Sequence, residues 1–307
     1  MFGSAKGAAA RNGHAACSGC SLCLLVCPVW RQTHDPRMTP EGRAKALQHG
    51  ATAAEIAASV RSCTLCGACE PVCPEEIDLV GMTLDLRARL ADTVTMEKSS
   101  ALAGENGPRP ATSGAAPVVF VPGPALRSNP QAVARVAALL GGIACEDEGD
   151  GIVLALQAGI PVPHHLRDRF LAGLRSAHTI VVDDGLWLRQ LRAWLPKAHL
   201  IGLGEALSSL DSVRRGLRKG DLYVIEPRSY HRDYERLVKH YDRLRTERGC
   251  ALNLDLQRIA IPVAGQVDWI LKGLSVERIV VERLEDAAEF MRHGKYPVVH
   301  VAELADH

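Results

Sequence analysis

The chain has 307 residues, of which 47% are hydrophobic and 23% are charged, and its formal net charge at pH 7 is +1. This length allows two or three domains that each bury a core, and the near-zero net charge offers no electrostatic basis for binding nucleic acid. No apolar run approaches the roughly 18–20 residues that span a bilayer. We therefore expect a cytoplasmic protein with no transmembrane segment of its own. Any association with the inner membrane would be through a partner protein.

Eight of the ten cysteines lie in two short stretches that share one pattern. Residues 17–28 read CSGCSLCLLVCP and residues 63–74 read CTLCGACEPVCP, so each stretch is C-x2-C-x2-C-x3-C followed by proline. This spacing is the bacterial ferredoxin signature, in which the fourth cysteine of each run ligates the cluster of the other run. The proline fixes φ just after the last cysteine and is expected to end the local turn.

The pattern predicts two [4Fe–4S] clusters with crossed ligation. The first cluster is expected to bind Cys17, Cys20, Cys23 and Cys73, and the second Cys63, Cys66, Cys69 and Cys27. Structural zinc is the alternative, because CxxC pairs also bind zinc, but two full sets of four favour iron–sulfur ligation. The remaining cysteines, Cys145 and Cys250, are expected to be buried free thiols.

Helical character marks the segments that follow each cysteine run. Thr39 is a candidate N-cap, Pro40 fits the first helical position, and Glu41 favours the first turn. Alanine-rich periodicity follows, and residues 77–90 form an amphipathic stretch after the second run. We therefore expect helices around the cysteines in place of the β-hairpin of a small free ferredoxin.

The PEG triplet at 40–42, the helix after it, RSCTLCGACEPVCPEEID at 61–78 and the next helix resemble the α-helical ferredoxin module. That module occurs in the C subunit of heterodisulfide reductase, the iron–sulfur subunit of glycolate oxidase and the C subunit of anaerobic glycerol-3-phosphate dehydrogenase. It is related to the second half of the succinate dehydrogenase iron–sulfur subunit. The resemblance covers about residues 14–92. It implies an electron-transfer subunit that works with a flavoprotein or other iron–sulfur subunits and delivers electrons to a quinone or an iron–sulfur acceptor.

The composition changes after the ferredoxin-like part. Gly, Pro, Ser and Ala dominate a linker, after which short β-branched runs alternate with helical patterns, as in parallel sheets covered by helices. The segments 178–207 and 277–305 repeat the order strand, helix, strand. We predict an α-helical ferredoxin domain followed by tandem α/β, Rossmann-like subdomains. The expected boundaries are 1–92 for the ferredoxin domain, 93–116 for the linker, and 117–215 and 216–307 for the subdomains.

The second half resembles the tandem cysteine-rich CCG domain that accompanies this ferredoxin module in relatives such as heterodisulfide reductase. The matching segments are FVPGP, VIEPRSYH, IVVDDGLW, IVVERLED, IPVAGQ and the closing HVAELADH. The positions of that family's cysteines hold Pro124, Asp184, Trp187, Arg228, Val263, Ala264, Arg283 and Asp286. Because these side chains cannot replace thiolates at a soft iron–sulfur site, we expect that family's additional metal centre and disulfide-reducing chemistry to be absent.

Three hypotheses for the function follow from these patterns. In the favoured one the chain is a non-catalytic electron-transfer subunit of an oxidoreductase complex, and its metal-free half is a docking platform. In the alternative, the chain is a catalytic subunit in which Arg228, Arg283, Asp184 and Asp286 converge to bind a substrate or another cofactor. The third is a scaffold protein with structural zinc, in which the metal has no redox role.

Overall fold

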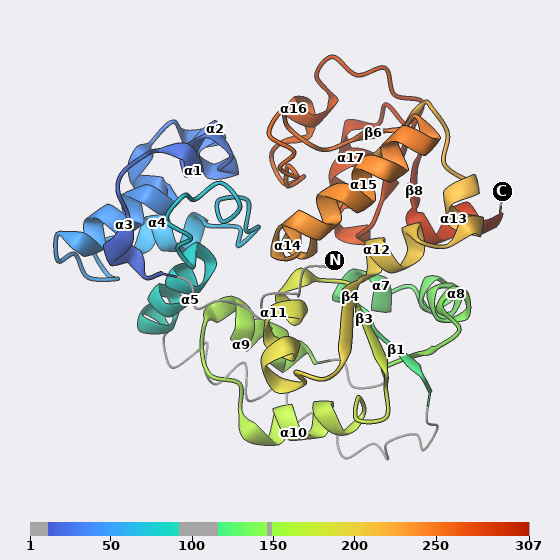
Figure 1. Ribbon diagram of the computed structural model, residues 1–307, viewed down its shortest axis with the longest axis horizontal. Coiled ribbons are helices and arrows are strands. Elements are labelled where there is room, and N and C mark those ends of the chain that lie inside the picture. Colours follow the sequence, from blue (N-terminus) through green and yellow to red (C-terminus); the bar gives the residue numbers. More distant parts are fainter. Residues whose placement is uncertain (1–11, 92–115, 146–148, 307) are drawn as a thin grey trace, which may run out of the picture. The chain divides into compact units, whose positions relative to one another are not determined.

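The computed structural model describes residues 12–91, 116–145 and 149–306. The chain divides into two compact units, Met1–Leu90 and Ala91–His307, and each is described by itself (Figure 1). The predicted linker lies outside the described residues except for position 116, and the predicted domain boundaries stay predictions. No helix in the described ranges combines the length and the apolar character needed to cross a bilayer.

The first unit consists of short helices around the cysteine runs. In chain order these are η1 (His14–Ala16), α1 (Leu22–Leu25), α2 (Pro28–Thr33), η2 (Pro36–Met38), α3 (Pro40–Gln48), α4 (Ala57–Ser62) and α5 (Leu79–Leu90). Their apolar faces meet in one core that includes Val60, Ile77 and Leu86. The helices expected between the two cysteine runs and after the second run are therefore confirmed.

The first turn of α3 has the capping chemistry that the sequence predicts. Thr39 is the N-cap, and its Oγ1 accepts a hydrogen bond of 3.1 Å from the Gly42 backbone N–H, while Pro40 occupies the first helical position. Gly42 allows η2 to pack directly on this turn, because a Cβ atom there would lie 2.2 Å from the Pro36 carbonyl oxygen. This close contact fixes the turn that carries Glu41.

The second unit contains two four-stranded parallel sheets that share one strand order. The first sheet has the order β2-β1-β3-β4, formed by β1 (Val118–Val121), β2 (Ile143–Ala144), β3 (Thr179–Val182) and β4 (His199–Gly202). The second has the order β6-β5-β7-β8, formed by β5 (Asp221–Val224), β6 (Ala251–Leu252), β7 (Arg278–Val281) and β8 (Val298–His300). The predicted α/β architecture is thus confirmed.

Helices follow nearly every strand of this unit. Those of the first half are α7 (Pro124–Arg127), α8 (Pro130–Leu140), α9 (Asp150–Ala158), α10 (His164–Ala172), α11 (Gly185–Trp194), α12 (Leu203–Ser208) and α13 (Asp211–Arg215). Those of the second half are α14 (Pro227–Arg232), α15 (Tyr234–Arg248), α16 (Val267–Leu271), α17 (Leu284–His293) and η3 (Val301–Asp306). The last of these elements, η3, is a 3-10 helix.

The two sheets share a central core. Successive strand residues point to opposite faces, and on one face Phe120, Val181, Tyr223 and Val280 pack with α8, α12, α13 and α15 in a single apolar cluster. The opposite faces form two separate outer cores, one with α9, α10 and α11 and one with α16 and α17. Because both sheets contribute to the central core, the two halves of this unit are joined by apolar packing.

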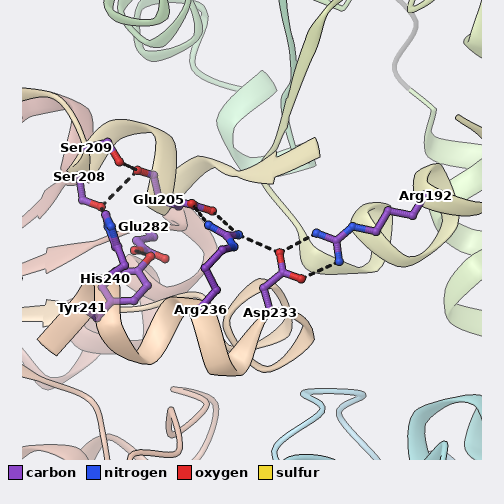
Figure 2. Close-up of polar contacts among 9 residues, drawn as sticks. All are labelled: Arg192, Glu205, Ser208, Ser209, Asp233, Arg236, His240, Tyr241 and Glu282. Atoms are coloured by element: carbon purple, nitrogen blue, oxygen red, sulfur yellow. Dashed lines mark hydrogen bonds and ion pairs between the residues drawn. The ribbon is translucent and has the colours of Figure 1, made fainter. Parts of the chain in front are cut away.

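Polar contacts connect the same halves, as Figure 2 shows. Arg192 of α11 forms a bidentate ion pair with Asp233, with N···O distances of 2.7 and 2.6 Å. Arg236 of α15 donates to Asp233 over 2.9 Å and also pairs with Glu205 of α12. A bidentate ion pair fixes the relative orientation of its two side chains, whereas partial exposure to solvent limits its contribution to stability. We infer that these linked ion pairs set how α11 and α12 lie against α15.

Candidate metal centre

The eight motif cysteines gather around two cavities in the first unit. One, the Cys27 cavity, is lined by Cys27, Cys63, Cys66 and Cys69. The other, the Cys73 cavity, is lined by Cys17, Cys20, Cys23 and Cys73. Each cavity therefore combines three cysteines of one run with the fourth cysteine of the other run. In the described ranges, no three Cys, His, Asp or Glu side chains meet closely enough to hold a single metal ion.

Helix ends position the cysteines of the Cys27 cavity. Cys27 is the N-cap of α2, with Pro28 at the first helical position, and Cys63 is the C-cap of α4. Pro28 therefore starts a helix, because its fixed φ suits the first helical turn, whereas the sequence alone predicts only the end of a turn there. Burial raises the pKa of the Cys66 thiol to about 11 and raises that of Cys69 well above its ordinary value.

The Cys73 cavity is more open to solvent. Cys20 is exposed and Cys17 is half-buried, whereas Cys23 is buried, which raises the pKa of its thiol to about 12. The backbone around Cys17 is held from α3, since Lys45 Nζ donates to the Cys17 carbonyl over 2.8 Å and Gln48 Nε2 donates to it over 3.0 Å. The Cys73 cavity therefore reaches the solvent at Cys20, while hydrogen bonds from α3 hold its backbone at Cys17.

The residues present fit iron–sulfur clusters. Each cavity offers four thiols, the ligand type that iron–sulfur clusters select, and metal binding replaces the proton of each thiol that it uses. Two residues that line the cavities each have a buried polar atom without a hydrogen-bond partner: Arg43 Nε at the Cys27 cavity and Glu41 Oε2 at the Cys73 cavity. These charged residues were not predicted as part of the site.

Comparison with known proteins places this module in a described class. Residues 13–77 match the family model of the 4Fe-4S dicluster domain. No curated protein and no solved structure matches the chain. The matched segment includes all eight motif cysteines, so the first unit contains an iron–sulfur, ferredoxin-like module that binds 4Fe–4S.

In the second unit, three of the residues predicted to stand at former cysteine positions meet after the strand ends. Asp184 follows β3, Arg228 follows β5 and Arg283 follows β7. Arg228 Nη1 lies 2.6 Å from Asp184 Oδ2, and Arg283 Nη2 lies 3.6 Å from the same oxygen. Asp286 is half-buried near Arg283, and desolvation raises its pKa to about 7. The structure thus brings together the residues that the catalytic alternative singles out, and it pairs their charges with one another.

The other predicted positions lie apart from this charged group. Trp187 stacks on Phe170 in an outer core, with ring centroids 4.6 Å apart. Val263 is buried in the other outer core, Pro124 begins α7 and Ala264 is exposed. Of the two remaining cysteines, Cys250 is buried as predicted. Cys145 is only half-buried, because it follows β2 at the edge of its sheet, so the prediction of a buried thiol there was wrong.

Buried carboxyl groups beside this charged group make the stability of the second unit depend on pH. Asp183 is 3% exposed, its Oδ2 accepts a 3.0 Å hydrogen bond from the Gly123 N–H, and its Oδ1 has no partner. Burial raises its pKa from 3.8 to about 8, with Glu285 adding to the shift and Arg283 opposing it. Burial likewise raises the pKa of Glu282 to about 8. The folded chain therefore binds protons more tightly than the unfolded chain.

We expect the free energy of unfolding to fall as the pH rises from about 4 to about 8, because the unfolded chain loses these protons first. Asp183→Asn should flatten this slope and leave the variant more stable than the parent at pH 8. Urea denaturation at pH 5 and pH 8 measures both effects. Asp168→Asn, on an exposed side chain, controls for the change in net charge. An unchanged slope in Asp183→Asn would show that Asp183 does not bind a proton in this range.

Proposed function

We propose that the chain is the iron–sulfur electron-transfer subunit of a multi-subunit oxidoreductase. The observation that carries the proposal is the pairing of three cysteines from one run with the fourth from the other at each cavity. Two [4Fe–4S] clusters bound there would supply reversible one-electron transfer. We assign one to Cys17, Cys20, Cys23 and Cys73, and the other to Cys63, Cys66, Cys69 and Cys27.

The surrounding residues hold the ligands and control the access of water. Arg87 of α5 donates to the Cys63 carbonyl, and Lys45 of α3 holds the Cys17 carbonyl, so two helices brace the ligand loops. Burial of Cys27 and Cys66 keeps water from one site, and solvent exclusion is one of the factors that set the potential of such a centre. None of these residues is assigned a bond-making step.

We further propose a flavoprotein or another iron–sulfur subunit as the electron donor, and a quinone or an iron–sulfur centre as the acceptor. The resemblance to heterodisulfide reductase and glycolate oxidase subunits supports this. We also propose a cytoplasmic location, with any approach to the membrane made through a partner. The second unit would be the docking platform: two related Rossmann-like subdomains of the CCG type without their metal site. Their common strand order supports the duplication.

The paired charges favour the platform over the catalytic alternative. A substrate or cofactor that used Arg228 and Arg283 would first have to separate them from Asp184, which lies 2.6 Å from Arg228. Breaking a buried ion pair leaves an uncompensated charge and is costly. A calorimetric titration of the full chain with glycolate tests this alternative, and heat of binding that disappears in Arg228→Met would support it.

The proposed partner can be tested with the full chain. An affinity-tagged chain purified without oxygen from its native host should retain a second protein that contains flavin, in fixed proportion to the tagged chain. A Cys17→Ser variant should lose iron and still retain that protein, because docking is assigned to the second unit. If flavin is absent from the purified complex, or if its retention follows the iron content, this part of the proposal is wrong.

A further inference from the structure

The two cavities are lined by charges of opposite sign. Arg43 is 2% exposed and is the one charged residue lining the Cys27 cavity in the part of the chain that the structure describes. Its Nη1 donates to the Ser59 carbonyl over 3.0 Å and lies 3.2 Å from Ser59 Oγ, while its Nε has no partner. The Cys73 cavity is instead lined by Glu41 and Glu75, and Glu41 Oε2 is buried without a partner.

One helix turn produces this separation. Glu41 and Arg43 lie two residues apart in the first turn of α3, and helix residues at that spacing point in nearly opposite directions. Thr39 and Gly42 fix the turn itself through the N-cap and the close contact with η2. The two residues therefore start from a fixed turn, and each lines the cavity of a different set of four cysteines.

Fixed charges in a poorly solvated site change the relative stability of redox states. A guanidinium remains charged at any ordinary pH, and its interactions are stronger in the protein interior than in water. A nearby cation favours the reduced state, which carries one more negative charge, and nearby carboxylates favour the oxidised state. Burial acts against the reduced state, so the enclosed Cys27 cavity would have the lower potential if Arg43 were absent.

We propose, on the basis of the function assigned above, that α3 sets the order of the two sites in the relay. Arg43 makes the Cys27 site the one of higher potential, where a single electron rests. Glu41 makes the Cys73 site the one of lower potential, which exchanges electrons with a one-electron donor or acceptor of the partner through its solvent-exposed side at Cys20. With clusters bound at both sites, one electron would pass from the Cys73 site to the Cys27 site without any bond being formed or broken.

The test is a redox titration of the full chain followed by EPR. Cys27→Ser, which should retain only the Cys73 site, identifies the signal of each site. In chains that carry one electron, the Cys27 site should hold that electron at least about tenfold more often than the Cys73 site. This ratio corresponds to a difference of about 59 mV between the two reduction potentials for a one-electron couple. Arg43→Gln should reduce this ratio at least about tenfold, Arg43→Lys should restore most of it, and Glu41→Gln should reduce it by raising the potential of the Cys73 site.

Arg37→Gln is the matched control, because Arg37 lies nearby in η2 with its side chain 87% exposed and lines neither cavity. If Arg43→Gln and Glu41→Gln both load normally and leave the electron distribution unchanged, the inference is overturned while the proposed function stands. If the Arg43→Gln variant does not bind its clusters, an unchanged electron distribution in Glu41→Gln is sufficient to overturn the inference. Absence of any reversible reduction in the parent chain would instead contradict the proposed function.

Discussion

Replacing Cys27 with serine should remove the cluster at the Cys27 cavity. The other three cysteines of its run should still hold the cluster at the Cys73 cavity. Cys27 lies in the first cysteine run, but the cavity it lines contains Cys63, Cys66 and Cys69. We therefore expect Cys27→Ser to retain about four of eight iron atoms per chain. The residual EPR spectrum after reduction should be the same as that of Cys66→Ser, a substitution in the other run.

Cys73→Ser provides the matched comparison for crossed ligation. Its cavity contains Cys17, Cys20 and Cys23, so its residual spectrum should be the same as that of Cys20→Ser. Serine is close to cysteine in size and binds iron–sulfur clusters less well because oxygen is a harder ligand. If Cys27→Ser instead resembles Cys20→Ser, each run holds its own cluster and the crossed assignment is wrong.

The second large effect is expected in the other unit, at the ion pair that joins its two halves. Arg228 and Asp184 are 18% and 12% exposed, with an N···O distance of 2.6 Å. Removing one partner from a buried pair leaves the other charge poorly compensated, and Asp184 would keep only the longer contact of 3.6 Å with Arg283. Arg228→Met should therefore lower the free energy of unfolding by up to about 3–5 kcal/mol, as measured by urea denaturation followed by tryptophan fluorescence.

A double-variant cycle separates the pair from other effects of the substitution. Asp184→Asn keeps an oxygen that can accept from the Leu186 N–H, as Asp184 does over 2.8 Å at the start of α11. The double variant should be about 1–3 kcal/mol more stable than the sum of the single effects predicts. Arg292→Met, which removes an exposed pair with Glu289, should cost about 0–1 kcal/mol. Strict additivity at 184 and 228 would mean that the pair does not stabilise the fold.

The features that could be predicted from sequence are those with short-range signals. The repeated cysteine spacing was sufficient to identify an iron–sulfur module, and residues 13–77 match the corresponding family model. Thr39 and Pro40 predicted the start of α3 because capping depends on adjacent residues. The β-branched runs predicted the parallel strands because strands buried on both faces are nearly continuous in apolar residues.

The features that could not be predicted depend on tertiary packing. Glu41 and Arg43 stand on either side of Gly42, and nothing in that order indicates that they line different cavities. The contact between Arg228 and Asp184 joins two sheets whose relative position is set by the shared central core. The short strands β2 and β6, of two residues each, are too brief for a periodic pattern to reveal.

The most direct test of the central claim is the iron and acid-labile sulfide content of the full chain purified without oxygen, with EPR after dithionite reduction. We predict about eight iron and eight sulfide per chain and a reduced spectrum in which the two clusters are magnetically coupled. Zinc in place of iron, or only about four iron per chain, would contradict the account of two clusters in one relay.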